Sequence, residues 1–294
     1  MTEPAPPRSS GRRLESGLGV QCDGLRHVYE VDGAEVVALH DVDLTVRAGE
    51  SVALLGPSGS GKSTLLTLLA GLLRPTSGRL FVGGDDTTRM SERELLDLRA
   101  QRIGVVVQGP GRNLLPYGTA KDNVRFAQRA VRGFRRDDLP DPVRLLDSLG
   151  LGALVDQPAG RMSGGEQQRL SVALAMASAP GLLLADEPTS QLDRDSRDRV
   201  IEMLQTITGQ FGTTLIAVTH DADVARALGR TVTIVEGRAD DHGQHREQYV
   251  AVRTDGSVQL PDDLRDVLPP GSLARLVRKP EGIELLRAER EDRP

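Results

Sequence analysis

The residues best suited to chemistry form a glycine-rich loop that carries a lysine followed by two hydroxyl residues. Positions 56–64 have the sequence Gly-Pro-Ser-Gly-Ser-Gly-Lys-Ser-Thr, which contains the pattern G-x-x-x-x-G-K-[ST]. Glycines let successive backbone N–H groups approach phosphate oxygens, and a following helix N-terminus adds its positive dipole end. Lys62 can then reach the β- and γ-phosphates, and the Ser63 hydroxyl can ligate Mg²⁺. The loop therefore predicts a bound nucleoside triphosphate.

The surroundings of the loop distinguish it from a chance match. A strand-like apolar run over 52–55 precedes it, and a helix-like run over 65–73 follows it. The alternative is a glycine- and serine-rich turn, and the strand–loop–helix order argues against that alternative. We expect the whole loop to contact the nucleotide, namely Gly56, Pro57, Ser58, Gly59, Ser60, Gly61, Lys62, Ser63 and Thr64.

Two adjacent carboxylates end a second apolar run. Positions 182–188 have the sequence Leu-Leu-Leu-Ala-Asp-Glu-Pro. Asp186 suits a contact with the water shell of Mg²⁺, as in other phosphate-loop enzymes. Glu187 is then placed to polarise an attacking water as a general base. Such a run is weak evidence alone, but downstream of a phosphate-binding loop it predicts hydrolysis of the bound triphosphate.

A second anion-binding turn precedes these carboxylates. Positions 162–169 have the sequence Met-Ser-Gly-Gly-Glu-Gln-Gln-Arg. A Ser-Gly-Gly turn that opens a helix offers free N–H groups, a hydroxyl and a helix dipole. A plain helix cap is the structural alternative, yet one nucleotide does not need two cradles in one chain. The order of these motifs closely resembles the ATP-binding-cassette (ABC) family, whose signature is Leu-Ser-Gly-Gly-Gln, over roughly residues 19–237.

The resemblance implies roles for four more residues. Gln108 is similar to the glutamine that senses the γ-phosphate and Mg²⁺, and His220 to the switch histidine that contacts the γ-phosphate. Tyr29 is similar to the aromatic residue that stacks on adenine, and Asp193 ends a loop that communicates across a dimer. For His220 a satisfied buried histidine is the alternative, and for Tyr29 a core or surface tyrosine.

The expected site extends beyond the phosphate loop. The resemblance adds the signature residues to the nucleotide contacts, namely Ser163, Gly164, Gly165 and Glu166. The expected catalytic residues are Lys62, Gln108, Glu187 and His220. The expected Mg²⁺ ligands are Ser63, Gln108 and Asp186. The implied cofactors are ATP and Mg²⁺, and the implied activity is ATP hydrolysis coupled to transmembrane transport.

Some positions depart from the family pattern. Met162 replaces the usual leucine with a side chain of similar volume. Glu166 replaces glutamine and Gln191 replaces a small residue, and neither change removes a phosphate donor. The segment from Gln108 to Pro116 carries two more residues than the common pattern Gln-x-x-Asn-Leu-Leu-Pro. Because this region normally meets the membrane partner, we expect a docking surface specific to a subfamily.

The family resemblance also implies partners. It predicts a head-to-tail homodimer in which each ATP lies between Lys62 and Ser63 of one copy and Ser163 and Gly165 of the other. Details of the motifs most resemble the macrolide-exporter, lipoprotein-release and division-associated branch, which drives separate integral-membrane permeases. An importer or drug-efflux branch is one alternative, and a soluble cassette protein with a regulatory DNA-binding module is another. Substrate choice then lies in the permease.

The elements that must position these residues indicate an α/β fold. Nearly continuous apolar runs are typical of strands buried on both faces, and helix-like patterns between them predict a mainly parallel sheet. The strand-like runs are 103–107, 182–185 and 214–218, and the helix-like ones are 92–102, 167–177 and 196–208. Alternating runs over 20–46 predict an antiparallel sheet. A polar stretch over 109–165 predicts a helical subdomain, with helices at 120–132 and 143–149.

Composition limits the function classes. Of 294 residues, 38% are hydrophobic and 27% charged, and a net charge of −5 gives no general attraction to nucleic acid or anionic lipid. The single cysteine, Cys22, fits a reducing compartment. Residues 1–18 lack an apolar signal-peptide core and predict a flexible tail. No apolar run is long enough to span a bilayer. We expect a cytoplasmic protein that reaches the inner face of the membrane through its permease.

The end of the chain predicts a separate small module. A polar linker over 238–247 precedes residues 248–288, which suggest a hairpin at 249–260, a proline-initiated helix to 268 and a second hairpin at 273–286. This order resembles the swapped-hairpin fold of AbrB-like regulators, which interlock as dimers and bind DNA. Basic and acidic residues are balanced here, which favours a dimer clamp or regulatory module over DNA contact or a misassigned linker.

Overall fold

The structure, a computed structural model, describes residues 17–31, 33–109, 111–131, 139–190, 192, 194–241, 274–279 and 282–287. The chain divides into two compact units, residues 1–245 and 246–294, and each is described by itself. The strands of the first unit are β1 (Val20–Val31), β2 (Ala34–Val46), β3 (Ser51–Leu55), β4 (Ser77–Val82), β5 (Asp85–Asp86), β6 (Ile103–Val106), β7 (Leu182–Asp186), β8 (Thr214–Thr219), β9 (Arg230–Val235) and β10 (Arg238–Asp241). Its helices are α1 (Lys62–Leu69), α2 (Glu92–Gln101), α3 (Ala120–Gln128), α4 (Pro142–Ser148), α5 (Gly164–Met176), α6 (Arg194–Phe211) and α7 (Ala222–Leu228).

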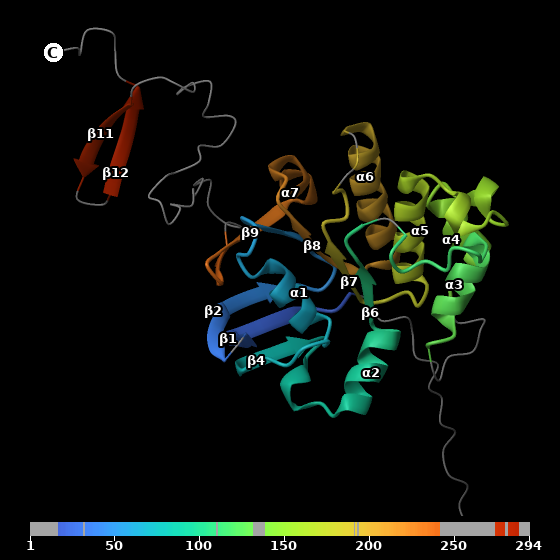
Figure 1. Ribbon diagram of the computed structural model, residues 1–294, viewed down its shortest axis with the longest axis horizontal. Coiled ribbons are helices and arrows are strands. Elements are labelled where there is room, and N and C mark those ends of the chain that lie inside the picture. The colour runs from blue at the N-terminus through green and yellow to red at the C-terminus, as the bar shows by residue number, and fades with distance from the viewer. Residues whose placement is uncertain are drawn as a thin grey trace, which may run out of the picture. The chain divides into compact units, whose positions relative to one another are not determined.

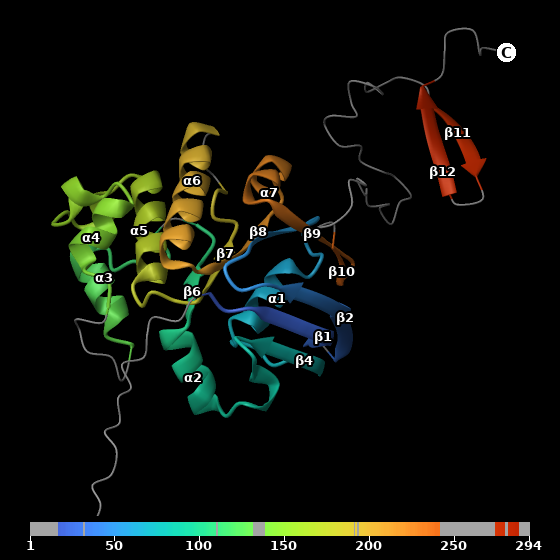
Figure 2. The ribbon, with the colours of Figure 1, turned by 180° about the vertical axis from the view of Figure 1, so that it is seen from behind.

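A six-stranded sheet forms the centre of the first unit, in the order β10-β9-β3-β8-β7-β6. Its strands are parallel except for β10, which pairs antiparallel with β9. Helices α5, α6 and α7 cover one face and α1 and α2 the other (Figures 1 and 2). Because successive side chains of a strand point to opposite faces, β7 and β8 each supply residues to both cores. The first core lies between the sheet and α5, α6 and α7, and it includes Leu183, Ala185, Leu215 and Ala217. The second core lies between the sheet and α1 and α2, and it includes Leu182, Leu184, Ile216 and Val218. The predicted parallel sheet is confirmed.

An antiparallel sheet in the order β2-β1-β4-β5 packs beside the central one. The long ribbon of β1 and β2 was expected from the alternating pattern over 20–46, and the structure confirms it. Strand β4 was not predicted, because its sequence Ser-Gly-Arg-Leu-Phe-Val has apolar residues only in its second half. Helix α1 packs against β2 on one side and against β7 and β8 on the other (Figure 1). The phosphate-loop helix is therefore held between two sheets.

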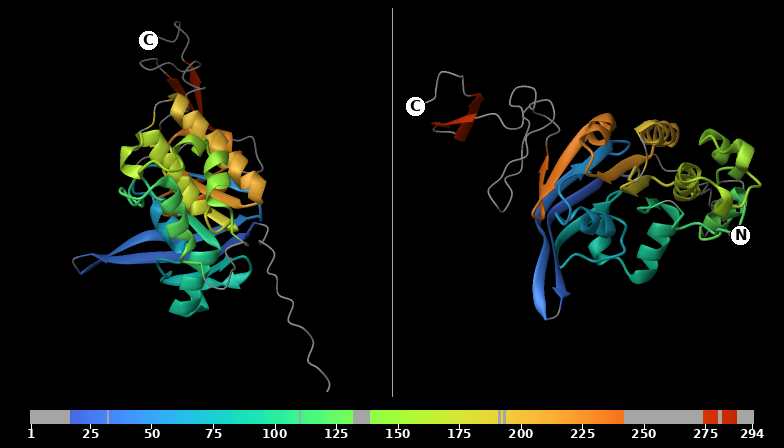
Figure 3. Two further views of the ribbon diagram at one scale, coloured as in Figure 1. Left: turned by 90° about the vertical axis from the view of Figure 1, so that its right-hand side faces the viewer. Right: turned by 45° about the horizontal axis from the view of Figure 1, so that its top comes forward.

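The helical subdomain consists of α3 and α4 packed on α5. Thr119 opens α3 with a capping box to Asp122, and Asp141 caps α4 with Pro142 in the first turn. Both arrangements satisfy free N–H groups of a first helical turn. The right-hand view of Figure 3 shows α3 and α4, in green, at the end of the unit away from β1 and β2, in blue. The helix expected at 120–132 is present but ends at Gln128, and the helix expected at 143–149 is present one residue earlier, at Pro142–Ser148.

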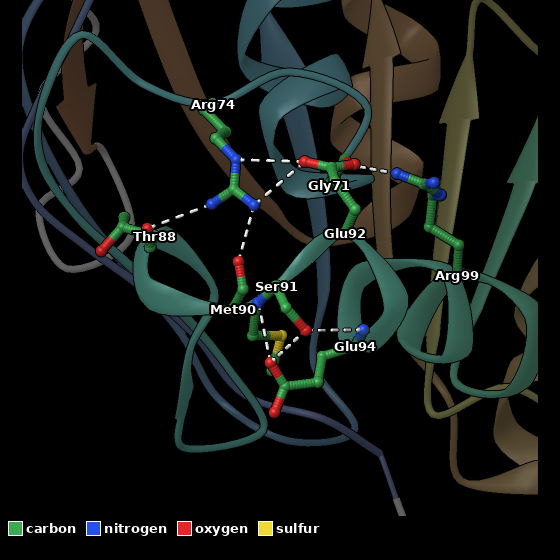
Figure 4. A network of polar contacts seen from close by, with 8 residues as sticks. All are labelled: Gly71, Arg74, Thr88, Met90, Ser91, Glu92, Glu94 and Arg99. Carbon is green, nitrogen blue, oxygen red and sulfur yellow. Dashed lines mark hydrogen bonds and ion pairs between the residues drawn. The ribbon is translucent and has the colours of Figure 1, made fainter.

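A polar network fixes the connection between α1 and α2 (Figure 4). The Arg74 guanidinium donates to the carbonyl oxygen of Met90 at 2.6 Å and to that of Thr88 at 3.2 Å, and it pairs with Glu92 at 3.1 Å. Arg99 from α2 donates to the carbonyl of Gly71, just beyond α1. Arginine suits this task because its planar fork offers several donors at once. The network therefore ties α2 to the loop that follows α1.

Two boundaries differ from the sequence prediction. Gly17 and Leu18 were assigned to the flexible tail, but their N–H groups donate to the carbonyls of Gly212 and Gly181, and Leu18 is buried. Residues 238–241 were assigned to the linker but form β10, where Ala239 packs against the second core. The polar composition of this strand concealed it, since an edge strand needs few apolar residues. Residues 1–16 and 242–247 lie outside the described part of the chain.

Within the second unit the structure describes an antiparallel hairpin of β11 (Ala274–Lys279) and β12 (Gly282–Arg287). This matches the second hairpin expected around the Pro-Glu-Gly turn. The first hairpin and the proline-initiated helix lie outside the described residues, so the AbrB-like resemblance stays a prediction. Among the helices that the structure describes, none combines the length and the apolar character needed to cross a bilayer.

Candidate functional site

A cavity of about 740 Å³ lies between the phosphate loop and the carboxyl ends of β7 and β8. It collects most of the residues that the sequence assigned to one site, although they come from five separate segments. The predicted residues that line it are Tyr29, Ser58, Gly59, Gly61, Lys62, Ser63, Thr64, Gln108, Asp186, Glu187 and His220. The carboxyl ends of parallel strands meet at one edge of a sheet, which is where α/β proteins bind ligands.

Two glycines of the loop are required by close backbone approaches. A Cβ atom at Gly56 would lie 2.1 Å from the carbonyl oxygen of Ile234, and one at Gly61 would lie 2.5 Å from that of Ala38. Gly61 also has φ of 101°, a conformation that side chains with a Cβ rarely adopt. These approaches place the loop between β9 and β2, so its shape is fixed by neighbours as well as by its own sequence.

Lys62 is the basic centre of the cavity. It is only 7% exposed, and its Nζ donates to the carbonyl oxygens of Gly56 at 2.7 Å and Pro57 at 2.6 Å. Burial lowers the pKa of the ammonium group, and the nearby carboxylates of Glu187 and Asp186 oppose this effect. An ammonium held by two neutral carbonyls can exchange these acceptors for phosphate oxygens, which form stronger, charge-assisted hydrogen bonds.

Asp186 and Glu187 stand at the end of β7. Burial raises the pKa of Asp186, Glu187 adds to the rise, and Lys62 opposes it. Glu187 has φ of 47°, and its N–H donates to the carbonyl oxygen of Val218 at 3.0 Å. The Ser190 hydroxyl donates to the Glu187 carbonyl, also at 3.0 Å. A non-glycine residue in the left-handed region is strained, and such strain concentrates at functional sites.

His220 meets Glu187 from the neighbouring strand. Its Nδ1 lies 2.9 Å from Oε1 of Glu187. The histidine side chain is 68% exposed, whereas that of Glu187 is 13% exposed. A carboxylate in this position can accept a proton from a water, and an imidazole beside it can orient it and contact a phosphate. Gln108, which follows β6, lines the same cavity.

Tyr29 lies at the β1 end of the cavity. Its hydroxyl donates to the Thr64 hydroxyl at 3.3 Å, and its ring meets that of His27 edge-on with 4.6 Å between centroids. The cavity wall continues through Val36, Val37 and Ala38, which the sequence analysis did not single out. The strand pairing could have found them, because Tyr29 pairs with Val36 in the register of β1 and β2. The result is an apolar surface suited to the face of a base.

The signature turn lies apart from this cavity, since none of Ser163, Gly164, Gly165 and Glu166 lines it. Ser163 caps α5: its N–H donates to Oε2 of Glu166 at 2.8 Å, and its hydroxyl accepts from the Glu166 N–H. Hydrogen bonds from the Ser163 backbone and side chain to the Glu166 carboxylate lower the pKa of Glu166. The helix cap considered as an alternative is therefore present. Gln191 and Asp193 lie outside the described residues.

The donor set of the cavity fits Mg²⁺. This ion prefers oxygen ligands, keeps several waters and is bound through one or two carboxylates together with substrate phosphates. Ser63, Gln108 and Asp186 supply a hydroxyl, an amide and a carboxylate around one cavity. Among the described residues no cluster of three His, Cys, Asp or Glu side chains can hold a metal alone. A site of this kind would be completed by the phosphates.

Comparison with known proteins agrees with this geometry. A family model described as ABC transporter matches residues 39–190. The chain is 43% identical over 228 residues to the lipoprotein-releasing system ATP-binding protein LolD of Anaeromyxobacter dehalogenans, covering 77% of this chain and 95% of that protein. It is 40% identical over 233 residues to the macrolide export ATP-binding/permease protein MacB of Rhodopirellula baltica, covering 79% of this chain but only 34% of that protein.

Solved structures show the same fold. The ATP-binding cassette MJ0796, in a dimeric post-hydrolysis state bound to ADP and Pi, superposes with a TM-score of 0.66 at 32% identity, covering 75% of this chain and 96% of that one. CbiO1 of Clostridium perfringens, part of the ABC transporter complex cbiONQ, gives a TM-score of 0.67 at 28% identity, covering 75% and 86%. The motifs, the cavity and these matches agree: the chain belongs to the ABC transporter family and is an ATP-binding and ATP-hydrolysing subunit.

Proposed function

We propose that two copies of this chain close head to tail over two MgATP molecules and thereby drive a separate integral-membrane permease of the export or mechanotransmission type. The observation that carries the proposal is the separation of the two anion-binding turns, the phosphate loop and the signature turn at 163–166. The signature turn opens α5 outside the nucleotide cavity, and a Cβ at Gly165 would meet no atom within 4 Å. A second copy can therefore approach this turn closely, with its own nucleotide facing it.

In this proposal the ATP phosphates replace the loop carbonyls as partners of Lys62. Ser63, Gln108 and Asp186 would hold Mg²⁺, which supplies charge neutralisation to the β- and γ-phosphates. Tyr29 and the Val36–Ala38 wall receive the base. The signature residues Ser163 and Gly165 of the second copy then offer hydroxyl and N–H donors to the γ-phosphate. ATP favours the closed dimer because only that state contains both cradles.

Hydrolysis requires a water aligned with the γ-phosphate. Glu187 accepts a proton from this water as the general base, and His220 keeps the Glu187 carboxylate oriented and contacts the γ-phosphate. Catalysis is then mostly positioning and charge stabilisation. Loss of the γ-phosphate contacts lets the dimer open.

The relatives support the transport setting. One is named for a lipoprotein-releasing system and another for macrolide export, and the latter carries its permease in the same chain. We infer that this chain works at the inner, cytoplasmic face of the membrane, bound to a permease encoded separately. The helical subdomain and the segment after Gln108, with exposed Leu115 and Tyr117, supply an apolar surface for that contact.

A pair of variants tests the proposed dimer. E187Q should lose turnover by about 10²- to 10⁴-fold, as expected for removal of a general base, and should form a dimer with MgATP in light scattering. The double variant E187Q/G165D should remain monomeric, because a carboxylate in the signature turn repels the triphosphate of the second copy. An aspartate in a first helical turn does not harm the helix, so the melting temperature should hold. A MgATP dimer of E187Q/G165D as stable as that of E187Q would refute the head-to-tail arrangement.

A further inference from the structure

A second cavity, of about 550 Å³, adjoins the nucleotide cavity. The two cavities share Gln108, Glu187 and His220, so the Glu187–His220 pair forms part of the wall between them. Arg197, from α6, lines the second cavity together with Asp221, the residue that follows His220. The sequence analysis did not single out Arg197, because its position in a charged helix gives no signal of its own.

Arg197 is held in a defined position. Its side chain is only 18% exposed, and its Nη1 lies 2.8 Å from Oδ2 of Asp221. Its Nε lies 3.1 Å from Oδ1 of the neighbouring Asp198. The guanidinium therefore links α6 to the residue that caps α7 through two different nitrogen donors. A lysine cannot reproduce this geometry, because it has a single ammonium group.

The two carboxylate oxygens of Asp221 accept hydrogen bonds from different groups. Oδ1 accepts from the N–H groups of Asp223 at 2.8 Å and Val224 at 3.4 Å, which caps α7. Oδ2 accepts from Arg197. The Asp221 N–H donates to the Thr219 hydroxyl at 3.1 Å. The peptide that carries His220 is therefore fixed on its C-terminal side by the cap of α7, and that cap is fixed by Arg197.

We propose that Arg197 is a positioning residue for ATP hydrolysis, which holds Asp221 and thereby sets His220 against Glu187. The inference rests on the proposed roles of Glu187 and His220. The geometric link is short, since Asp221 is bonded to His220 and Nδ1 of His220 lies 2.9 Å from Glu187. A small displacement at the reacting groups costs a large factor in rate, of order 10²-fold for about 1 Å.

The fold does not depend on this ion pair. Helices α6 and α7 also pack through buried apolar side chains of the first core, namely Val200, Ile201, Leu204, Val224, Ala225 and Leu228. The same helix α7 offers a matched control in the pair of Arg226 with Asp223, whose side chains are 73% and 57% exposed. Exposed pairs of this kind contribute little.

The test measures kcat and KM for MgATP, nucleotide affinity and melting temperature for the full chain and its variants. R197A should lower kcat about 10- to 100-fold with KM and ATP affinity within about twofold, because the phosphate loop is untouched. D221N, which keeps Oδ1 as the cap acceptor, should lower kcat similarly. R197A/D221N should be no worse than either single variant. R197K should recover part of kcat, and R226A should match the wild type.

The outcomes separate this inference from the proposed function. If E187Q abolishes turnover while R197A and D221N keep kcat within twofold of the wild type, the positioning role is wrong and the general base stands. If E187Q retains turnover, the proposed base is wrong, and so is a role for Arg197 that acts through it. If R197A has a markedly lower melting temperature than the wild type, the test rests on D221N and R197K. A loss of kcat in these variants at an unchanged melting temperature supports the positioning role, and an unchanged kcat overturns it.

Discussion

The Nδ1 atom of His220 lies 2.9 Å from Oε1 of Glu187, although the two residues are 33 positions apart in the chain. Strand order explains the contact. β7 and β8 are parallel neighbours with Asp186 paired to Val218, so both strands end at the same edge of the sheet. The N–H of Glu187 extends this pairing by donating to the Val218 carbonyl. The proposed base and the residue proposed to orient it are therefore brought together by the sheet rather than by a local motif.

Replacement of Lys62 should weaken ATP binding specifically. K62A removes charge-assisted hydrogen bonds to the phosphates, each of about 1.5–3 kcal/mol, so the dissociation constant should rise about 10- to 100-fold by calorimetry. K121A is the matched control, because the Lys121 side chain does not line the cavity and makes a long contact of 3.9 Å with the exposed Asp156. Equal ATP affinity of K62A and K121A would contradict the placement of Lys62 on the phosphates.

Gly61 should tolerate no Cβ. G61A combines left-handed strain of about 1–2 kcal/mol with a clash against the Ala38 carbonyl, and it should lower both the melting temperature and ATP affinity. Gly150 also has a positive φ, of 68°, but a Cβ there would meet no atom within 4 Å. In G150A the melting temperature should therefore fall only by the effect of backbone strain, and by less than in G61A. Equal melting temperatures of G61A and G150A would rule out the close approach of Gly61 to β2.

The capping box of α5 predicts a pH dependence. Hydrogen bonds from the backbone N–H and the hydroxyl of Ser163 hold the pKa of Glu166 below its usual value of 4.5. A carboxyl with a lowered folded-state pKa contributes stability that is complete above about pH 4.5 and is lost as the pH falls through the folded-state pKa. E166Q should therefore lose less stability than the wild type between pH 6 and pH 3, as measured by denaturant unfolding, and identical pH profiles would contradict this.

Removal of the second unit tests the dimer clamp that the C-terminal sequence suggests. The cut belongs after residue 245, where the compact units divide, because β10 runs to Asp241 and should stay intact. The shortened chain should keep its ATP affinity within about twofold, since every described residue of the cavity lies before the cut. We expect it to lose self-association in the absence of nucleotide, measured by sedimentation. Undiminished self-association would discard the clamp.

The sequence by itself determined the family, the phosphate loop and four strands of the central sheet, β3, β6, β7 and β8, whereas β9 was not predicted. These follow from local rules: glycine spacing predicts a phosphate cradle, and continuous apolar runs predict strands buried on both faces. The chain order of the motifs also placed Asp186, Glu187 and His220 in one site. Polar edge strands were missed, because β10 forms through pairing with β9 and needs little apolar sequence.

Only the tertiary structure decided how the site is assembled. The Val36–Ala38 wall depends on the register of β1 and β2, and the approach of Gly61 to Ala38 depends on how the two sheets pack. The contact of Arg197 with Asp221 depends on the packing of α6 beside α7. Sequence patterns report which face of an element is buried, whereas side chains meet across elements only after strand order, register and helix packing are fixed.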